Sequence, residues 1–174
     1  MKGETPGVVF DCNLFLQAAI SPRGPAFACL SLVERGSLRL IISPEVLSEA
    51  RDVLNRPELT RKFVMLAPER VARLLADIEG KAVMVRDVPR TVELPHDPKD
   101  EPYINLALAA GARYLVSRDH HLLDLMQDEQ FPKRYPDLAI LNPVALLQEI
   151  AVSGQREQEP EQAPDREPGQ DIDH

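Results

Sequence analysis

Four carboxylates in this 174-residue chain stand where a fold would bring them together. Asp11 directly follows the apolar run 8–10, and Asp119 follows residues 114–118, so each acid lies at or just past the C-terminal end of a predicted strand. Ligands of open α/β sheets bind in the crevice at these strand ends. Glu49 and Asp100 lie on predicted helices that would aim them at the same crevice. Because like charges repel unless a cation lies among them, the pattern predicts a divalent metal site.

Each of these acids also has a simpler role that the sequence leaves open. An Asp after a strand often caps the next helix, although Asn13 is equally able to cap the first helix in place of Asp11. Glu49 lies on the rim of the apolar stripe of its helix, where a solvated surface role is the alternative. Asp100 shares the helix face that packs on the sheet, so we interpret it as a ligand. Asp97 is then the helix cap or a group that supports the ligands.

Oxygen ligands favour Mg²⁺ or Mn²⁺ as the metal. A zinc site is disfavoured, because the adjacent His120 and His121 should point to different sides and no Cys or spaced His completes a tetrahedral set. Crowding of like charges should raise the pKa values of the carboxylates in the metal-free protein. The same acids would raise the pKa of the Cys12 thiol, so we interpret Cys12 as a packing residue rather than a nucleophile.

Alternating strands and helices would position these residues. The pattern predicts strands over residues 8–10, 39–42, 81–85, 113–117 and 138–141. It predicts helices over residues 13–20, 25–34, 44–55, 68–78, 100–110 and 142–150, and a short one from residue 60. Gly36 and Gly111 suit helix C-termini, and residues 89–98 suit a loop. This alternation favours a parallel sheet with helices on both faces.

The composition separates one domain, residues 1–153, from an acidic tail. Residues 154–174 are rich in Gln, Glu, Pro and Asp, and we expect them to be disordered and solvated. The net charge is −8, of which residues 151–174 carry −5. A charge of this sign disfavours a broad non-specific nucleic-acid binder. No apolar stretch approaches the roughly 20 residues that span a bilayer, and no signal peptide is evident, so we expect a cytoplasmic protein.

With these residues placed, the chain resembles the PIN-domain nucleases. The matching segments are VVFDCN from Val8, SPEVLSE ending at Glu49, DPKDEPYINLA from Asp97, GARYLVSRD ending at Asp119, and Asn142-Pro143 before the last helix. The similarity spans roughly residues 7–150 and keeps the order of all four acids. It looks closest to the branch of VapC-type ribonuclease toxins of toxin–antitoxin systems.

The resemblance implies a three-layer α/β/α sandwich and a homodimer. It implies a metal-dependent endoribonuclease that acts as a toxin, with RNA as substrate and a small antitoxin protein as a possible partner. By the same resemblance, the metal-binding and catalytic residues are Asp11, Glu49, Asp100 and Asp119. The residues that support the site are Asn13 and Ser117.

Two residues depart from the family pattern. Cys12 stands where the family usually has Thr or Ser, and His121 stands where this branch often has a second Asp. Since all four acids are present, we expect activity to survive with an altered metal affinity.

Two other functions remain open from the sequence. One is a housekeeping RNA-processing nuclease of the same fold, which a neighbouring antitoxin gene would argue against. The other is a non-catalytic binding module. The intact acids disfavour a degenerate nuclease site, and the lack of a Gly-rich loop after Phe10 disfavours a nucleotide-binding fold.

Overall fold

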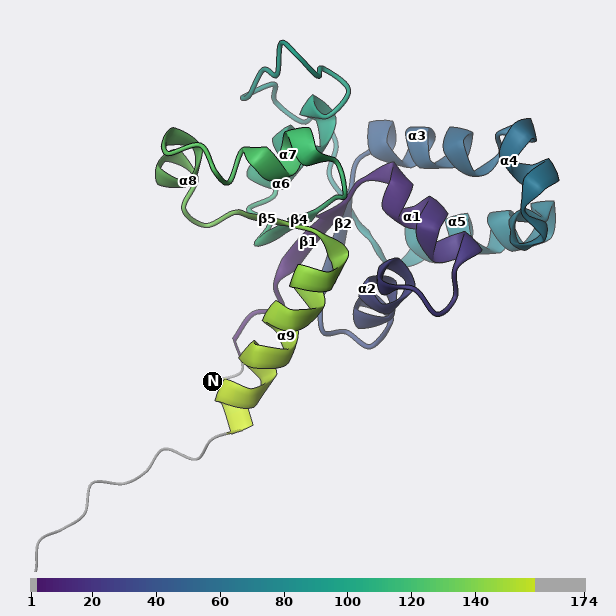
Figure 1. Cartoon of the computed structure of the whole chain (residues 1–174), viewed down its shortest axis with the longest axis horizontal. Coiled ribbons are helices and arrows are strands. Elements are labelled where there is room, and N and C mark those ends of the chain that lie inside the picture. Colours follow the sequence, from purple (N-terminus) through teal and green to yellow (C-terminus); the bar gives the residue numbers. More distant parts are fainter. Residues whose placement is uncertain (1–2, 159–174) are drawn as a thin grey trace, which may run out of the picture.

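The computed structural model describes residues 3–158. These residues fold around one parallel sheet (Figure 1). Within these residues the sheet has five strands in the order β3-β2-β1-β4-β5. They are β1 (Gly7–Phe10), β2 (Arg39–Ile42), β3 (Val83–Met84), β4 (Tyr114–Val116) and β5 (Ala139–Leu141). The chain moves from β1 towards one edge and later returns to the other side of β1. The switch point of the sheet therefore lies between β1 and β4, where a ligand crevice is expected.

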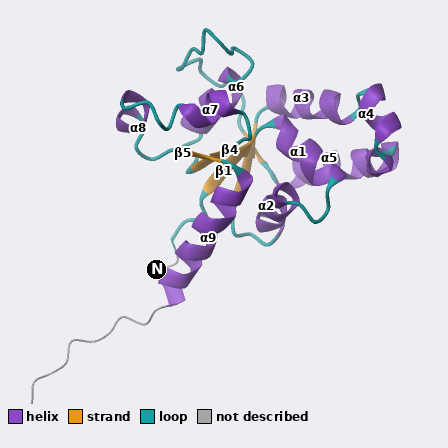
Figure 2. Cartoon of the chain, in the orientation of Figure 1, coloured by secondary structure: helices purple, strands orange, loops and turns teal. Residues whose placement is uncertain are grey.

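Helices cover both faces of this sheet, as the ribbon coloured by secondary structure shows (Figure 2). They are α1 (Cys12–Ile20), α2 (Pro25–Glu34), α3 (Pro44–Leu54), α4 (Pro57–Lys62), the 3-10 helix η1 (Val64–Leu66), α5 (Pro68–Lys81), α6 (Glu101–Ala109), α7 (His120–Asp124), α8 (Gln130–Arg134) and α9 (Pro143–Gln158). Helix α6 packs on β1, β2 and β4, while α9 packs on β4 and β5 and also contacts α2. This arrangement confirms the three-layer α/β/α sandwich.

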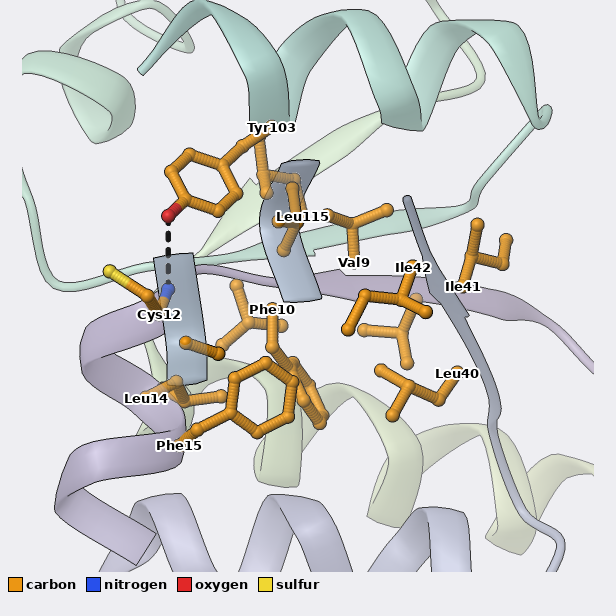
Figure 3. Close-up of a cluster of buried hydrophobic side chains, with 14 of the residues drawn as sticks. Val9, Phe10, Cys12, Leu14, Phe15, Leu40, Ile41, Ile42, Tyr103 and Leu115 are labelled. Carbon is orange, nitrogen blue, oxygen red and sulfur yellow. Dashed lines mark hydrogen bonds between the residues drawn. The ribbon is translucent and has the colours of Figure 1, made fainter. Parts of the chain in front are cut away.

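The central strands are buried except at the start of β2, where Arg39 is exposed. Residues 8–10, 40–42 and 114–116 are all buried, because a parallel strand covered on both faces has no solvent side. Figure 3 shows Tyr103 of α6 on one side of the sheet and the rings of Phe10 and Phe15 on the other. These two rings meet edge to face with their centroids 5.8 Å apart. The ends of β1 and β4 are thus held on a rigid core.

The predicted helix ends are confirmed where their capping chemistry is local. Gly36 and Gly111 have positive φ angles of 76° and 61° and follow the C-termini of α2 and α6. Next to each, the chain closes the hydrogen-bond pattern of a Schellman motif, with Ser37 N–H donating to Leu32 O at 2.9 Å after α2. At the start of α9, the Asn142 side chain accepts from Ala145 N at 2.8 Å.

Three boundaries differ from the sequence prediction. Lys81, expected in a strand, ends α5 and forms an ion pair with Glu34 of α2, so that β3 keeps only two residues at the sheet edge. Helix α4 begins at Pro57 rather than near residue 60, because proline is favoured in a first turn. Residues 154–158, expected in the tail, continue α9, and residues 151–158 include the helix formers Ala, Gln, Arg and Glu.

The remainder of the predicted tail, residues 159–174, lies outside the described residues. Among residues 3–158, the helices all lack either the length or the apolar character that crossing a membrane would need.

Candidate active site

Asp11 lies at the C-terminal end of β1 and is the N-cap of α1. Its Oδ1 accepts from Leu14 N at 2.9 Å, and the Ser117 hydroxyl donates to its Oδ2. Burial raises the pKa of Asp11, the two hydrogen bonds lower it, and the charges of Asp119 and Glu49 raise it further. The expectation that capping does not require Asp11 was wrong.

Asn13 lies inside α1, because the helix begins one residue earlier than predicted. The Asn13 side chain is exposed. The cap position therefore falls on Asp11, and a supporting role for Asn13 stays a prediction.

Asp119 follows β4 and caps α7 in the same way. Its Oδ1 accepts from His121 N at 2.9 Å, and its own N–H donates to Ser117 Oγ at 2.9 Å. Ser117 is fully buried, and its single hydroxyl bonds both Asp11 and Asp119. The two neighbouring strand ends are thus joined through one side chain.

Asp97, Asp100 and Asp119 form the tightest acidic group of the site, which we call the acidic cluster. One carboxylate oxygen from each lies within 4.8 Å of the others. Asp100 is 8% exposed, and its Oδ2 is buried without a hydrogen-bond partner in the described part of the chain. Burial raises the pKa of Asp100 to about 7, with further contributions from Asp119, Asp97 and Asp11. Crowding was predicted to raise these values, but burial is the larger cause.

Of the two roles that the sequence left open for Asp97, the helix cap was wrong, while a supporting role at the site stays a prediction. Asp100 occupies the N-cap position of α6 and makes no capping hydrogen bond with its side chain. The backbone N–H of Asp100 donates instead to Asp97 O at 3.2 Å, and this turn directs the Asp97 carboxylate towards the acidic cluster. A buried carboxylate oxygen without a partner is costly unless a cation satisfies it, so the residues fit a divalent metal.

Glu49 reaches the site from α3 and is half-buried. Its Oε2 accepts from the Tyr103 hydroxyl at 2.5 Å, and the same hydroxyl accepts from Cys12 N at 3.3 Å, as the dashed line in Figure 3 shows. Burial raises the pKa of the Cys12 thiol to about 11, and Glu49 and Asp11 add to this effect. The thiol is therefore protonated at neutral pH, as expected of a packing residue.

The two adjacent histidines differ from their prediction. The rings of His120 and His121 lie 4.1 Å apart, and both offer ligand atoms within 4.8 Å of an Asp119 oxygen. They were expected to point to different sides, but their rings lie together at the start of α7, tilted by 37° to each other. Imidazole nitrogens thus border the acidic cluster on one side.

Three residues of α6 that support the site were missed from the sequence: Glu101, Tyr103 and Asn105. Each is buried, although each is polar or carries a hydroxyl. The signal was present, because an Asn inside the apolar run Tyr103–Ala107 needs a partner if that face is buried. Only the fold shows what the partners are.

Comparison with known proteins agrees with this geometry. Residues 7–121 match the sequence pattern of the PIN domain. The chain belongs to the PIN domain family. No curated protein matches the sequence.

Two solved structures are similar to this PIN domain. PAE2754 from Pyrobaculum aerophilum has 16% sequence identity and a TM-score of 0.53, with 85% of this chain and 97% of that chain covered. VapBC2 from Rickettsia felis, bound to a DNA fragment from their promoter, has 14% identity and a TM-score of 0.47, with 78% and 98% covered. The first supports the fold of the PIN domain described above.

PIN domains are nucleases that use divalent metals, and the position of the acidic cluster agrees with that chemistry. The cluster lies where β1 and β4 end, at the switch point of the sheet.

Proposed function

We propose that this PIN domain is a metal-dependent endoribonuclease that hydrolyses RNA phosphodiester bonds with Mg²⁺ or Mn²⁺, and that it acts as the toxin of a toxin–antitoxin pair. One observation carries the nuclease proposal. The acidic cluster of a PIN domain contains a buried carboxylate oxygen, Asp100 Oδ2, that has no hydrogen-bond partner among residues 3–158.

Asp11, Glu49, Asp100 and Asp119 would hold the metal, as the family resemblance implies. We add Asp97 as a further ligand, because one of its carboxylate oxygens lies within 4.8 Å of those of Asp100 and Asp119. A bound divalent ion lowers the pKa of a coordinated water and offsets the charge that develops on the phosphate. Ser117 keeps the carboxylates of the two strand ends oriented, and Tyr103 does the same for Glu49. Orientation by such partners typically changes metal affinity by about 10- to 100-fold.

Positive charge for the RNA backbone would come from exposed side chains. Five of the exposed basic residues are candidates: Arg23, Arg51, Arg56, Lys99 and Arg118. Contacts with phosphate are electrostatic and independent of sequence, so cleavage should weaken as the salt concentration rises.

The toxin assignment rests on the resemblance of the sequence motifs. With it we propose a homodimer, a small antitoxin partner and a cytoplasmic site of action. We also propose that residues 1–153 carry the activity.

The experiment that tests the nuclease is incubation of purified protein with structured RNAs, with Mn²⁺, with Mg²⁺ or with excess EDTA. Cleavage should need the metal, and Asp100→Asn should abolish it. The control is Asp128→Asn, because Asp128 is an exposed acid outside the acidic cluster, and its Oδ1 accepts from Gln130 N at 2.9 Å. Cleavage in EDTA, or equal loss in both variants, would contradict the proposal.

A further inference from the structure

The acidic cluster depends on a loop that has no regular structure of its own. Residues 85–100 connect β3 to α6 without a helix or strand, and Asp97 lies near the end of this segment. A long irregular loop loses much conformational entropy when it is fixed. Something outside the loop must therefore hold Asp97 beside Asp100 and Asp119.

Asn105, in the second turn of α6, binds the middle of this loop. Its Oδ1 accepts from Thr91 N at 2.9 Å and from Val92 N at 2.8 Å. Its Nδ2 donates to Val92 O at 3.0 Å. The side chain thereby serves three backbone groups of the loop, and it is 4% exposed. Loss of a buried polar partner leaves such groups unsatisfied, which is costly.

Glu101, one turn earlier on α6, binds the adjoining residues. Its Oε1 accepts from Leu94 N at 2.8 Å, and its Oε2 lies 2.9 Å from both Nε and one terminal nitrogen of Arg90. Hydrogen bonds between a guanidinium and a carboxylate are strengthened by the charges and also restrict the orientation of both side chains. Glu101 and Asn105 together form what we call the loop clamp, which holds residues 90–94 on α6.

The loop clamp is connected directly to the acidic cluster. Asp97 N–H donates to Leu94 O at 3.0 Å, and Asp97 O accepts from Asp100 N at 3.2 Å. The position of Asp97 is therefore set on one side by Leu94, which Glu101 holds, and on the other by the start of α6. Among the described residues, neither Asn105 nor Glu101 forms a hydrogen bond with a carboxylate of the acidic cluster.

We propose that Asn105 and Glu101 are positioning residues that act through Asp97, holding its carboxylate as a metal ligand beside Asp100 and Asp119. The inference rests on the proposed metal-dependent nuclease. It assigns to α6 a second task beyond carrying Asp100, because the same helix fixes the loop that supplies another ligand.

The test is a double-mutant cycle on Mn²⁺ affinity, measured by titration calorimetry with the metal alone. Asn105→Ala should weaken Mn²⁺ binding by about tenfold, the range seen when the orienting partner of a ligand is lost. In an Asp97→Asn background the same change should have almost no further effect. Residues that act through one another are non-additive, whereas independent ones add.

Asn142→Ala is the matched control, because it removes an Asn side-chain bond to backbone, the N-cap of α9, far from the loop. It should lower the melting temperature while Mn²⁺ affinity stays unchanged. If Asn105→Ala does not fold, Arg90→Gln replaces it, since the Arg90 side chain is 64% exposed. Arg90→Gln should then weaken Mn²⁺ binding about two- to fourfold. The same substitution should have no further effect in the Asp97→Asn background.

Additive losses in the cycle, or unchanged affinity in the clamp variants, would overturn the positioning role while leaving the nuclease proposal in place. A wild-type protein that binds no Mn²⁺ would overturn both.

Discussion

Asp11 and Asp119 stand at the carboxyl ends of β1 and β4, whereas Asp97 stands on the irregular loop before α6, and different interactions hold the two kinds of acid. The strand-end acids accept from backbone N–H groups two or three residues ahead, and Ser117 joins them. The loop acid is held through side chains of another element, Glu101 and Asn105.

The difference shows that the acids of the site fall into two parts. One part is held by the rigid strand ends, and the other depends on the loop clamp. Asp11 and Asp119 are fixed because each follows a buried parallel strand. Each is also the N-cap of the helix that follows it, α1 or α7. Asp97 has its place only while the loop clamp is intact. The dependent part is therefore where metal affinity should be easiest to change without unfolding the domain.

The largest effect is expected at Asp100, which borders both parts. Asp100→Asn should lower metal-dependent RNA cleavage by about 100-fold or more, because a ligand charge is lost. The melting temperature of the metal-free protein should rise, since a buried, repelled carboxylate becomes neutral. Cleavage assays and thermal melts in EDTA check both results, and a lower melting temperature would argue against repulsion in the empty site.

The pH dependence of the metal-free protein follows from the same acid. The folded-state pKa of Asp100 is raised to about 7 from 3.8, and that of Asp11 is raised too. The folded protein then keeps protons that the unfolded chain releases, so this contribution to stability is present at acidic pH and is lost as the pH rises through 7. In EDTA, the melting temperature of the wild type should therefore fall between pH 5 and pH 8. The fall should be smaller in Asp100→Asn, which lacks this carboxylate.

Metal binding should show the opposite trend with pH. Protons compete with the ion for raised-pKa carboxylates, so the Mn²⁺-induced rise in melting temperature should be larger at pH 8 than at pH 5. A shift that is independent of pH would mean that Asp100 and Asp11 are not ligands.

Ser117→Ala tests the rigid part. The change removes the hydroxyl that donates to Asp11 and accepts from Asp119 N, so metal affinity should fall about tenfold. Because the lost partner is fully buried, the free energy of unfolding should also fall by about 1–3 kcal/mol. Ser153→Ala is the control, since that exposed hydroxyl bonds only a helix carbonyl. Equal effects in the two variants would contradict the prediction.

Tyr103→Phe should have a smaller effect, because Glu49 is half-buried and retains water as a partner. Loss of the hydroxyl should weaken Mn²⁺ binding a few-fold and lower the free energy of unfolding by about 1 kcal/mol. Calorimetry and denaturant melts of the variant measure both. A loss as large as that of Asp100→Asn would place Tyr103 among the principal groups of the site.

The smallest effect on the site is expected from Gly36→Ala. Gly36 has a φ of 76° at the end of α2, so alanine there should cost about 1 kcal/mol of stability. Cleavage measured well below the melting temperature should equal that of the wild type. A loss of cleavage activity would mean that backbone strain at the end of α2 changes the geometry of the site.

These contrasts also explain what the sequence was able to predict. The apolar strands and the glycines at the ends of α2 and α6 rest on residues a few positions apart, so their chemistry can be recognised along the chain. The order of the acids and their approach to one crevice followed from strand ends in the same way. The fold class was accessible because strand and helix periods alternate clearly.

The interactions that the sequence did not reveal range from those of the loop clamp, between residues 7 to 14 positions apart, to contacts across the whole fold. Tyr103 bonds Glu49, 54 residues away, and Ser117 bonds Asp11, 106 residues away. The Ser117 role came only through family resemblance, and the clamp residues came from no signal except an Asn in an apolar run. The mistaken cap at Asp97 has the same origin, because a DPKD segment suits a cap locally while the loop clamp places it elsewhere.

Helix α6 has a consequence for how this domain can evolve. Between Asp100 and Ala107 every residue except Pro102 is buried, and the polar ones contact the acidic cluster, the loop or Glu49. A surface helix ordinarily leaves half of its positions open to neutral substitution, but this stretch offers almost none. Divergence among descendants of this sequence should therefore bypass the buried positions of this stretch and collect in the exposed part of the preceding loop, for example at His96.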